Sequence, residues 1–256
     1  MAITRMNFRS KVLEKSTAVN VYLPDYSLEE YPVIYLLHGR SDDCNAWLNA
    51  TSLERYAEFF PFAIVMPQVE LSYYTDMIYG DNYWTYLTEE LPEKMNDWYH
   101  LSHSWEKRFV AGNSMGGYGS FKWALTKPNY FNGAVSFSGA LDVVDIWGKD
   151  PNRESDFAKI FGTKQQLSAS NNNLMKCLEA ANLSDNYTHF IQICGIEDFL
   201  YENNQRFRQR AGQNLLNYQY EEDYGGHDWH FWDEKIQDVL LQFSYLLEEQ
   251  ETRGCE

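Results

Sequence analysis

The chain has 256 residues, 44% of them hydrophobic and 16% aromatic, and its formal net charge is −16 at pH 7. This length and apolar content suffice for one large core, so we expect a single domain over residues 1–256. The negative charge argues against nucleic acid or an anionic membrane surface as a partner, because like charges repel at long range, and a small neutral or cationic substrate agrees better with it.

The N-terminal segment MAITRMNFRSKVLEKS lacks the continuous apolar stretch of a signal peptide, and no later stretch contains the roughly 18 apolar residues of a transmembrane helix. The four cysteines form no C-x-x-C pair, which excludes the common zinc spacing and a dense disulfide framework (Cys44, Cys177, Cys194 and Cys255). These features predict a cytoplasmic protein with reduced thiols, but a chain cleaved after a signal peptide would share them. A homo-oligomer is compatible with the sequence and is not specified by it.

Segments 2–10 and 16–25 alternate between apolar and polar residues around a polar break, which predicts an antiparallel β-ribbon. Five near-continuous apolar runs follow, and this pattern is typical of parallel strands that are covered on both faces. The runs are PVIYLL (32–37), FAIVM (62–66), RFVAG (108–112), GAVSFSG (133–139) and HFIQIC (189–194).

Between these runs, residues 84–99, 118–126 and 231–247 place apolar side chains at spacings of three and four, as amphipathic helices do. Strands that alternate with helices indicate an α/β fold with a mostly parallel, doubly wound sheet, and the ligand site of such a sheet lies at the carboxyl ends of its strands. Residues 141–186 are rich in Asn, Asp and Ser and exceed a simple crossover. We expect them to form a small cap insertion of short helices, for example at 156–162.

The segment AGNSMGGYGS (111–120) places Ser114 in a G-x-S-x-G pattern, directly after an apolar run and before a predicted helix. A nucleophile elbow requires this strand-turn-helix setting, because the sharp turn lifts the serine hydroxyl above the sheet. Side chains at Gly112 or Gly116 would collide with their neighbours in such a turn. We therefore interpret Ser114 as a candidate nucleophile and not as an incidental serine in a glycine-rich turn.

A serine hydroxyl is a poor nucleophile near neutral pH and needs a base. His227 is the preferred candidate, because it lies in the loop YGGHDW between a predicted last strand, NYQYEED, and the C-terminal helix. His230 is the main rival, but an N-cap at Asp228 would place it inside the first helical turn. The remaining histidines suit solvated, strand-opening or loop-stabilising positions (His38, His100, His103 and His189).

The base in turn needs a carboxylate that fixes its tautomer. Asp198 follows the buried run HFIQIC in the loop GIEDF, so the chain order is Ser, Asp, His. Glu197 is adjacent, and the sequence does not decide which of the two side chains turns inward. Asp142 and Asp145 follow another strand and are weaker candidates.

Acyl transfer also needs donors for the developing oxyanion. We expect one from the backbone N–H of Met115, which follows the serine, and one from the N–H of Arg40 in the loop YLLHGRSDD, where Gly39 permits a tight turn. The Arg40 guanidinium is expected to pair with Asp42 or Asp43 at the surface. This chemistry requires no metal ion and no organic cofactor.

Aromatic side chains near these loops are candidates for the walls of a substrate pocket, where they can stack on a sugar ring. The candidate pocket residues are Gly39, Trp47, Trp147 and Trp229. Since the chain contains eight tryptophans and nineteen tyrosines, most of its aromatic side chains are expected to pack in the core or at the surface.

Six motifs together resemble the esterase D-like esterase family of the α/β-hydrolase superfamily, especially bacterial tributyrin esterases and acetyl esterases. They are YLLHGRSDDCNAW, YWTYLTEELP, GNSMGGYGSFKWAL, FSGALD, GIEDFLYENN and YGGHDWHFWDEKI. The resemblance implies an α/β-hydrolase fold and a serine carboxylesterase for short-chain acyl esters, with Ser114, Asp198 and His227 as its triad. Feruloyl esterases, acetyl-xylan esterases and S-formylglutathione hydrolases are relatives. The last group usually has a cysteine-containing oxyanion segment, from which LLHGRSDD departs.

Two other classes of function remain as alternatives. Another hydrolase on the same scaffold, such as a thioesterase, lipase or peptidase, would share the nucleophile, because the fold does not determine the leaving group. A non-catalytic binding protein of this fold commonly lacks one member of the triad, and none is missing here. The preferred partner is a small-molecule ester.

Overall fold

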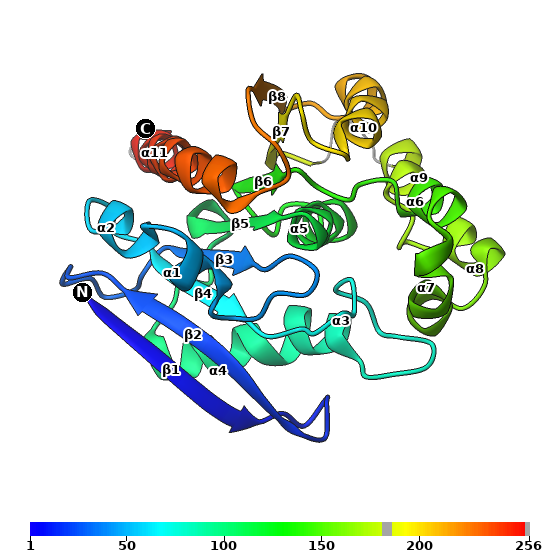
Figure 1. Cartoon of the computed structure of the whole chain (residues 1–256). Coiled ribbons are helices and arrows are strands. Elements are labelled where there is room, and N and C mark those ends of the chain that lie inside the picture. Colours follow the sequence, from blue (N-terminus) through cyan, green and yellow to red (C-terminus); the bar gives the residue numbers. More distant parts are fainter. Residues whose placement is uncertain (181–185, 254–256) are drawn as a thin grey trace.

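The computed structural model describes residues 1–180 and 186–253 and has an eight-stranded sheet at its centre (Figure 1). The strands are β1 (Ala2–Arg9), β2 (Ser16–Leu23), β3 (Val33–Leu37), β4 (Ala63–Pro67), β5 (Arg108–Asn113), β6 (Gly133–Phe137), β7 (His189–Gly195) and β8 (Tyr218–Asp223). Their order across the sheet is β1-β2-β4-β3-β5-β6-β7-β8. Only β1 with β2 and β2 with β4 pair antiparallel, so the predicted ribbon and mostly parallel sheet are both present.

Helices cover both faces of the sheet, and alternate strand residues pack against each layer. One layer consists of α1 (Ala46–Ala50), α2 (Leu53–Ala57) and α11 (Trp229–Arg253). The other consists of α3 (Tyr83–Thr85), η1 (Tyr86–Glu90), α4 (Leu91–Tyr99), α5 (Met115–Thr126) and α10 (Tyr201–Asn214). The short 3-10 turn η2 (Trp105–Lys107) precedes β5 and contacts α11. Because both faces are covered, the side chains of β3, β4 and β6 are buried along their whole length. No helix within the described residues combines the length and hydrophobicity needed to cross a membrane.

The predicted helix at 84–99 is present but contains a π-helical turn, η1, between α3 and α4. Pro92 explains this irregularity, because it has no N–H to donate to the carbonyl of Thr88, and its ring crowds that carbonyl in a regular α-helix. The freed carbonyl of Thr88 accepts a hydrogen bond from Nζ of Lys127, at 3.3 Å.

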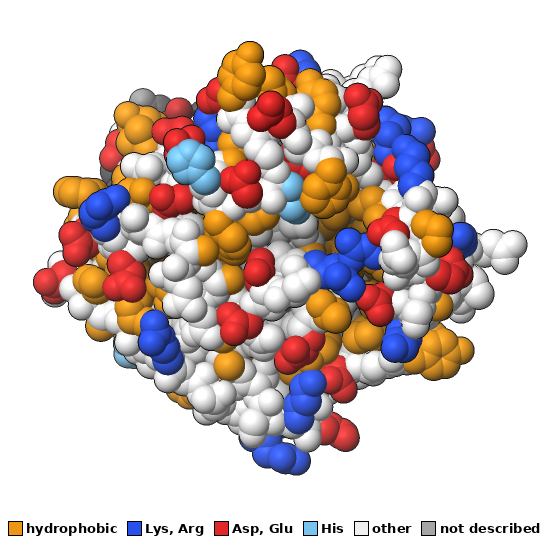
Figure 2. Space-filling view, in the orientation of Figure 1, with side chains coloured by type: hydrophobic (Ala, Val, Ile, Leu, Met, Phe, Trp, Pro, Cys, Tyr) orange, Lys and Arg blue, Asp and Glu red, His pale blue; other side chains and the backbone are white. Residues whose placement is uncertain are grey.

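Between β6 and β7 the chain forms a series of short helices, in the region where the cap insertion is expected. They are α6 (Val143–Lys149), η3 (Pro151–Arg153), α7 (Glu154–Phe161), α8 (Lys164–Ala169) and α9 (Leu174–Ala180). Residues 181–185 of the expected insertion lie outside the described residues. Beside these helices the surface is hollowed, with hydrophobic side chains inside the hollow and Lys or Arg side chains at its edge (Figure 2).

Lys122 on α5 is a buried base beneath the loop that connects β4 to α3, with 3% of its surface exposed. Its Nζ donates to the carbonyl of Tyr74 at 2.7 Å and to Oγ1 of Thr75 at 3.0 Å, and lies 4.2 Å from the ring centre of Trp84. Tyr73 and Tyr74 both have positive φ angles, 49° and 50°, which is uncommon for residues with bulky side chains. Lys122 therefore holds a strained turn in place.

Burial lowers the pKa of Lys122 to about 7, whereas an unfolded lysine titrates near 10.5. Between these values the unfolded chain binds one more proton than the native chain, so this residue makes the native state more stable as the pH rises. We expect the unfolding free energy of the wild type, minus that of Lys122→Met, to increase by about 1 kcal/mol per pH unit between about pH 7.5 and 9.5. Urea unfolding of both proteins across this pH range measures this difference. If the unfolding free energies of the two proteins change in parallel with pH, the lysine is not buried in its neutral form.

Candidate active site

Ser114 lies at the sharp turn between β5 and α5, with φ 54° and ψ −112°, a backbone conformation that residues with side chains rarely adopt. A Cβ atom at Gly112 would lie 2.5 Å from the carbonyl carbon of Gly116, and one at Gly116 would lie 2.3 Å from the carbonyl oxygen of Leu37. The glycines on either side of the serine are therefore required by close backbone packing, and the turn presents the hydroxyl at the carboxyl edge of the sheet.

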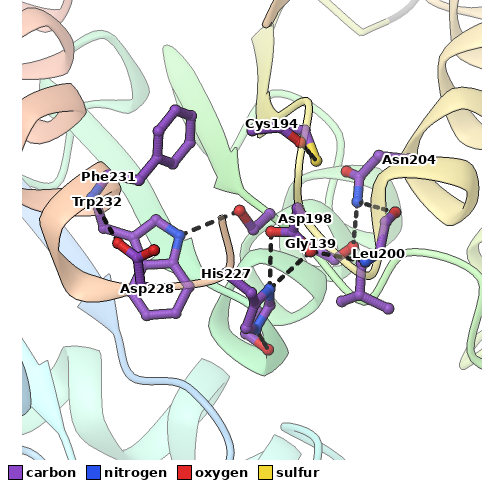
Figure 3. Close-up of polar contacts among 12 residues, drawn as sticks. Gly139, Cys194, Asp198, Leu200, Asn204, His227, Asp228, Phe231 and Trp232 are labelled. Atoms are coloured by element: carbon purple, nitrogen blue, oxygen red, sulfur yellow. Dashed lines mark hydrogen bonds and ion pairs between the residues drawn. The ribbon is translucent and has the colours of Figure 1, made fainter. Parts of the chain in front are cut away.

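His227 lies in the loop between β8 and α11, and its Nε2 is 2.9 Å from Oγ of Ser114. Asp228 accepts a hydrogen bond from the backbone N–H of Phe231 at 3.0 Å, so it caps α11 as expected (Figure 3). His230 then falls in the first turn of α11, where its side chain is 85% exposed and faces Glu234. The structure brings His227, and not His230, to the serine.

Asp198 follows β7, and its carboxylate faces Nδ1 of His227, with Oδ2 at 2.9 Å and Oδ1 at 3.1 Å (Figure 3). The side chain is fully buried, and Oδ1 also accepts from the backbone N–H of Leu200 at 2.7 Å, which fixes its orientation. Glu197, the adjacent carboxylate, is exposed. The loops that follow β7 and β8 approach closely at Gly195 and Gly225. A Cβ atom at Gly195 would lie only 2.2 Å from the carbonyl oxygen of Gly225, so this approach requires a glycine.

The weaker candidates have other partners. Asp142 caps α6 and Asp145 forms ion pairs with Lys149 and Arg206, which places both carboxylates away from His227. His38 is buried, and burial lowers its pKa, so its ring is neutral.

The neutral ring of His38 orients the loop that follows β3. Nε2 accepts from the backbone N–H of Val69 at 3.2 Å, and Nδ1 lies 2.8 Å from the carbonyl oxygen of Gly39. Since C=O and N–H point in opposite directions across a trans peptide, the N–H of Arg40 points away from the His38 ring. The hydroxyl of Tyr74 holds the same loop by donating to the carbonyl of His38 at 2.8 Å.

Met115 is the first residue of α5, so its backbone N–H has no acceptor within the helix and remains free for a ligand. The Arg40 guanidinium pairs with Asp156 on α7. The prediction that it pairs with Asp42 or Asp43 is therefore wrong. Asp156 lies 116 residues further along the chain, and only the tertiary fold brings it over this loop.

Two pockets meet at Ser114. One, of about 220 Å³, lies under the helical segment 143–161 and is lined by Tyr73, Ala140, Ile146 and Leu200 together with charged side chains, among them Arg153 and Arg206. The other, of about 300 Å³, contains His227 and is lined by Gly39, Asp42, Asn113, Trp229 and Trp232. Gly39 and Trp229 thus lie where a substrate can reach them.

Trp47 and Trp147 are not pocket residues, which corrects the sequence-based expectation. They are 1% and 2% exposed, and their indole N–H groups donate to the carbonyl of Leu37 and to Glu154. Both rings pack in the hydrophobic core, as most aromatic side chains of this chain do.

The sequence did not identify Phe199 and left Tyr73 undecided between a pocket wall and ordinary packing, and both residues shape the site. The ring of Phe199 lies 4.4 Å from that of His227, and Tyr73 forms part of the smaller pocket. The position of Phe199 directly after Asp198 is a signal that was available.

This arrangement can transfer a proton from the serine hydroxyl to an imidazole that a buried carboxylate orients. Among residues 1–180 and 186–253, no three His, Cys, Asp or Glu side chains are grouped to hold a metal ion.

Known proteins are similar to this chain in both sequence and structure. The model of the esterase family described as "Putative esterase" matches residues 10–243. An acetyl esterase of Caldicellulosiruptor saccharolyticus is 28% identical over 257 residues, which cover 92% of this chain and 96% of that protein.

Two solved Staphylococcus aureus structures are similar over 95% of this chain and 98% of theirs, each with 28% identity. They are the substrate-bound fluorophosphonate-binding serine hydrolase FphF, with a TM-score of 0.88, and the S-formylglutathione hydrolase FrmB, with a TM-score of 0.83. The chain therefore belongs to this esterase family, has the α/β-hydrolase fold and is a serine ester hydrolase.

Proposed function

We propose that this carboxylesterase cleaves short-chain acyl esters, acetyl to butyryl, through a triad of Ser114, His227 and Asp198. The observation that carries the proposal is the continuous hydrogen-bonded series from the serine Oγ through both imidazole nitrogens to the buried carboxylate. This is the geometry by which a base activates a serine while a carboxylate fixes its tautomer.

In this mechanism, Ser114 attacks the ester carbonyl carbon while Nε2 of His227 takes the hydroxyl proton. The N–H groups of Met115 and Arg40 stabilise the oxyanion, and Asp198 stabilises the imidazolium. The C–O bond to the alcohol then breaks, and the alcohol leaves with the proton from His227. Water, activated by the same imidazole, hydrolyses the acyl-enzyme and restores the serine.

The dimensions of the smaller pocket support short acyl chains. Its volume is about 220 Å³, and charged side chains such as Asp145, Lys149 and Arg153 form much of its wall. A long alkyl chain would displace the hydration of these groups without providing partners for them, which is unfavourable. We propose that this pocket holds the acyl group, with the helices of segment 141–186 as its cap.

The acyl preference can be measured with p-nitrophenyl acetate, butyrate, octanoate and palmitate. We expect kcat/KM to be highest for acetate or butyrate and to fall at least about tenfold at octanoate, because the longer chain must displace water from the charged side chains of this pocket. Equal or rising kcat/KM with octanoate and palmitate would contradict the short-chain assignment.

Acylated carbohydrates are a second candidate class. The half-buried Trp229 lines the pocket beside His227, where an indole face can stack on a sugar ring. Release of acetate from an acetylated oligosaccharide, measured alongside p-nitrophenyl acetate, tests this class.

A further inference from the structure

The pocket that contains His227 is the place for the leaving group, if the proposed triad mechanism is correct. The departing alcohol or thiol takes its proton from Nε2 of His227, so its heteroatom must come within hydrogen-bonding distance of that nitrogen. His227 lines the pocket of about 300 Å³ and does not line the pocket of about 220 Å³. The chemistry of the larger pocket then determines which leaving groups the enzyme accepts.

Asp42 gives this pocket a negative charge that no cation neutralises. Its carboxylate is half-buried and packs against the backbone at Gly39. A Cβ atom at Gly39 would lie only 2.8 Å from Oδ2 of Asp42. Within the described parts of the chain, no lysine, arginine or histidine forms an ion pair with Asp42. Arg40 also lines this pocket, but its guanidinium is already paired with Asp156 and not with Asp42.

The surroundings of Asp42 do not replace the missing cation. Burial raises the pKa of the Asp42 carboxyl, and the neighbouring Asn113 amide and the nearby His227 only partly oppose this effect. Asp228 lines the same pocket and adds a second carboxylate. The indole rings of Trp229 and Trp232 complete the wall, with their centroids 5.0 Å apart and their planes at 87°.

We propose that Asp42 is a specificity-determining residue that makes this pocket prefer leaving groups with a positive charge, such as amino or quaternary ammonium alcohols and thiols, over anionic ones. A cation here gains attraction to the half-buried carboxylate of Asp42 and lies beside the half-buried indole of Trp229. An anion is repelled by the half-buried carboxylate of Asp42 and, more weakly, by the exposed carboxylate of Asp228. The net charge of −16 acts in the same direction at longer range.

This preference separates the chain from an enzyme that releases glutathione. Glutathione carries two carboxylates and one ammonium group, so it is a net anion at neutral pH. The proposal therefore predicts that this chain, although similar in structure to the S-formylglutathione hydrolase FrmB, hydrolyses glutathione thioesters poorly.

The sharpest test uses two thioesters that share the acetyl group and differ in the charge of the thiol, acetylthiocholine and S-acetylglutathione. In both reactions Nε2 of His227 takes the hydroxyl proton as Oγ of Ser114 bonds to the acetyl carbon, the C–S bond breaks, and the sulfur takes that proton and leaves as the thiol. The measured quantity is the ratio of kcat/KM for the cationic substrate to that for the anionic one. Intrinsic reactivity cancels when this ratio is compared between variants.

For Asp42→Asn we expect this ratio to fall at least about tenfold relative to the wild type at low ionic strength. Asp43→Asn is the matched control, because it makes the same change in net charge at the next residue. Asp43 is exposed, and its Oδ1 accepts a hydrogen bond from the backbone N–H of Asn45. It should leave the ratio within about twofold of the wild type, because the exposed carboxylate of Asp43 does not line the pocket and faces high-dielectric water. Asp42→Ser provides a second variant if Asp42→Asn does not fold.

Equal ratios in the wild type and both Asp42 variants, or no turnover of acetylthiocholine, would overturn the proposal. p-Nitrophenyl acetate, whose leaving group is not cationic, distinguishes a failure of the leaving-group proposal from a failure of the proposed function. If the wild type hydrolyses it and Ser114→Ala does not, the proposed function stands whatever the thioester ratio. If both proteins are equally inactive, the proposed function itself fails.

Discussion

Replacing Ser114 with alanine is expected to lower kcat/KM for p-nitrophenyl acetate by at least about 10⁴-fold while the fold remains intact. Alanine removes the Oγ atom that forms the acyl-enzyme in the proposed mechanism, and the glycines that permit the turn are unchanged. Initial rates at matched protein concentration measure the loss, and circular dichroism with thermal unfolding checks the fold.

Ser168→Ala is the matched control for this variant, because Ser168 is an exposed serine on α8 whose Oγ donates to the carbonyl of Lys164. It should keep wild-type activity. A folded Ser114→Ala protein that retains a tenth of the wild-type rate would show that another group performs the attack.

Asp198→Asn is expected to reduce kcat/KM by about 10³ to 10⁴-fold, whereas Glu197→Gln should change it by less than about twofold. An asparagine at 198 no longer stabilises the imidazolium, and its amide can hold His227 in the wrong tautomer. Both substitutions remove one negative charge from adjacent residues of similar shape, but only Asp198 contacts the imidazole.

Comparing the two carboxylate variants with each other controls for the general loss of charge in this loop. Equal losses from both would contradict the assignment of Asp198. A large loss from Glu197→Gln alone would assign the role to Glu197, which is exposed in this structure.

The strands were predictable because a parallel sheet covered on both faces imposes near-continuous apolar runs. The run GAVSFSG at 133–139 corresponds to β6 (Gly133–Phe137), and HFIQIC at 189–194 corresponds to β7 (His189–Gly195). Helix α10 (Tyr201–Asn214) was not predicted, because its sequence YENNQRFRQRAGQN is strongly polar and buries only a few side chains, among them Phe207 and Ala211. Its packing depends on tertiary contacts that local periodicity does not show.

The chain order of the site residues was readable because each follows the carboxyl end of a strand, where the topology brings loops together. The side-chain contacts between distant parts of the chain were not readable from the sequence. The pairing of Arg40 with Asp156 and the burial of Trp47 and Trp147 depend on where helices α1, α6 and α7 pack, which local sequence patterns do not specify. The same limit applies to Asp42, whose importance emerges only from the pocket around it.

The central claim, that Ser114 is the activated nucleophile, is tested most directly by labelling with a fluorophosphonate probe followed by peptide mass spectrometry. We predict one adduct per chain on the peptide that contains Ser114, lost in Ser114→Ala and formed much more slowly in Asp198→Asn. An adduct on a different residue, or esterase activity that survives complete labelling elsewhere, would contradict the account.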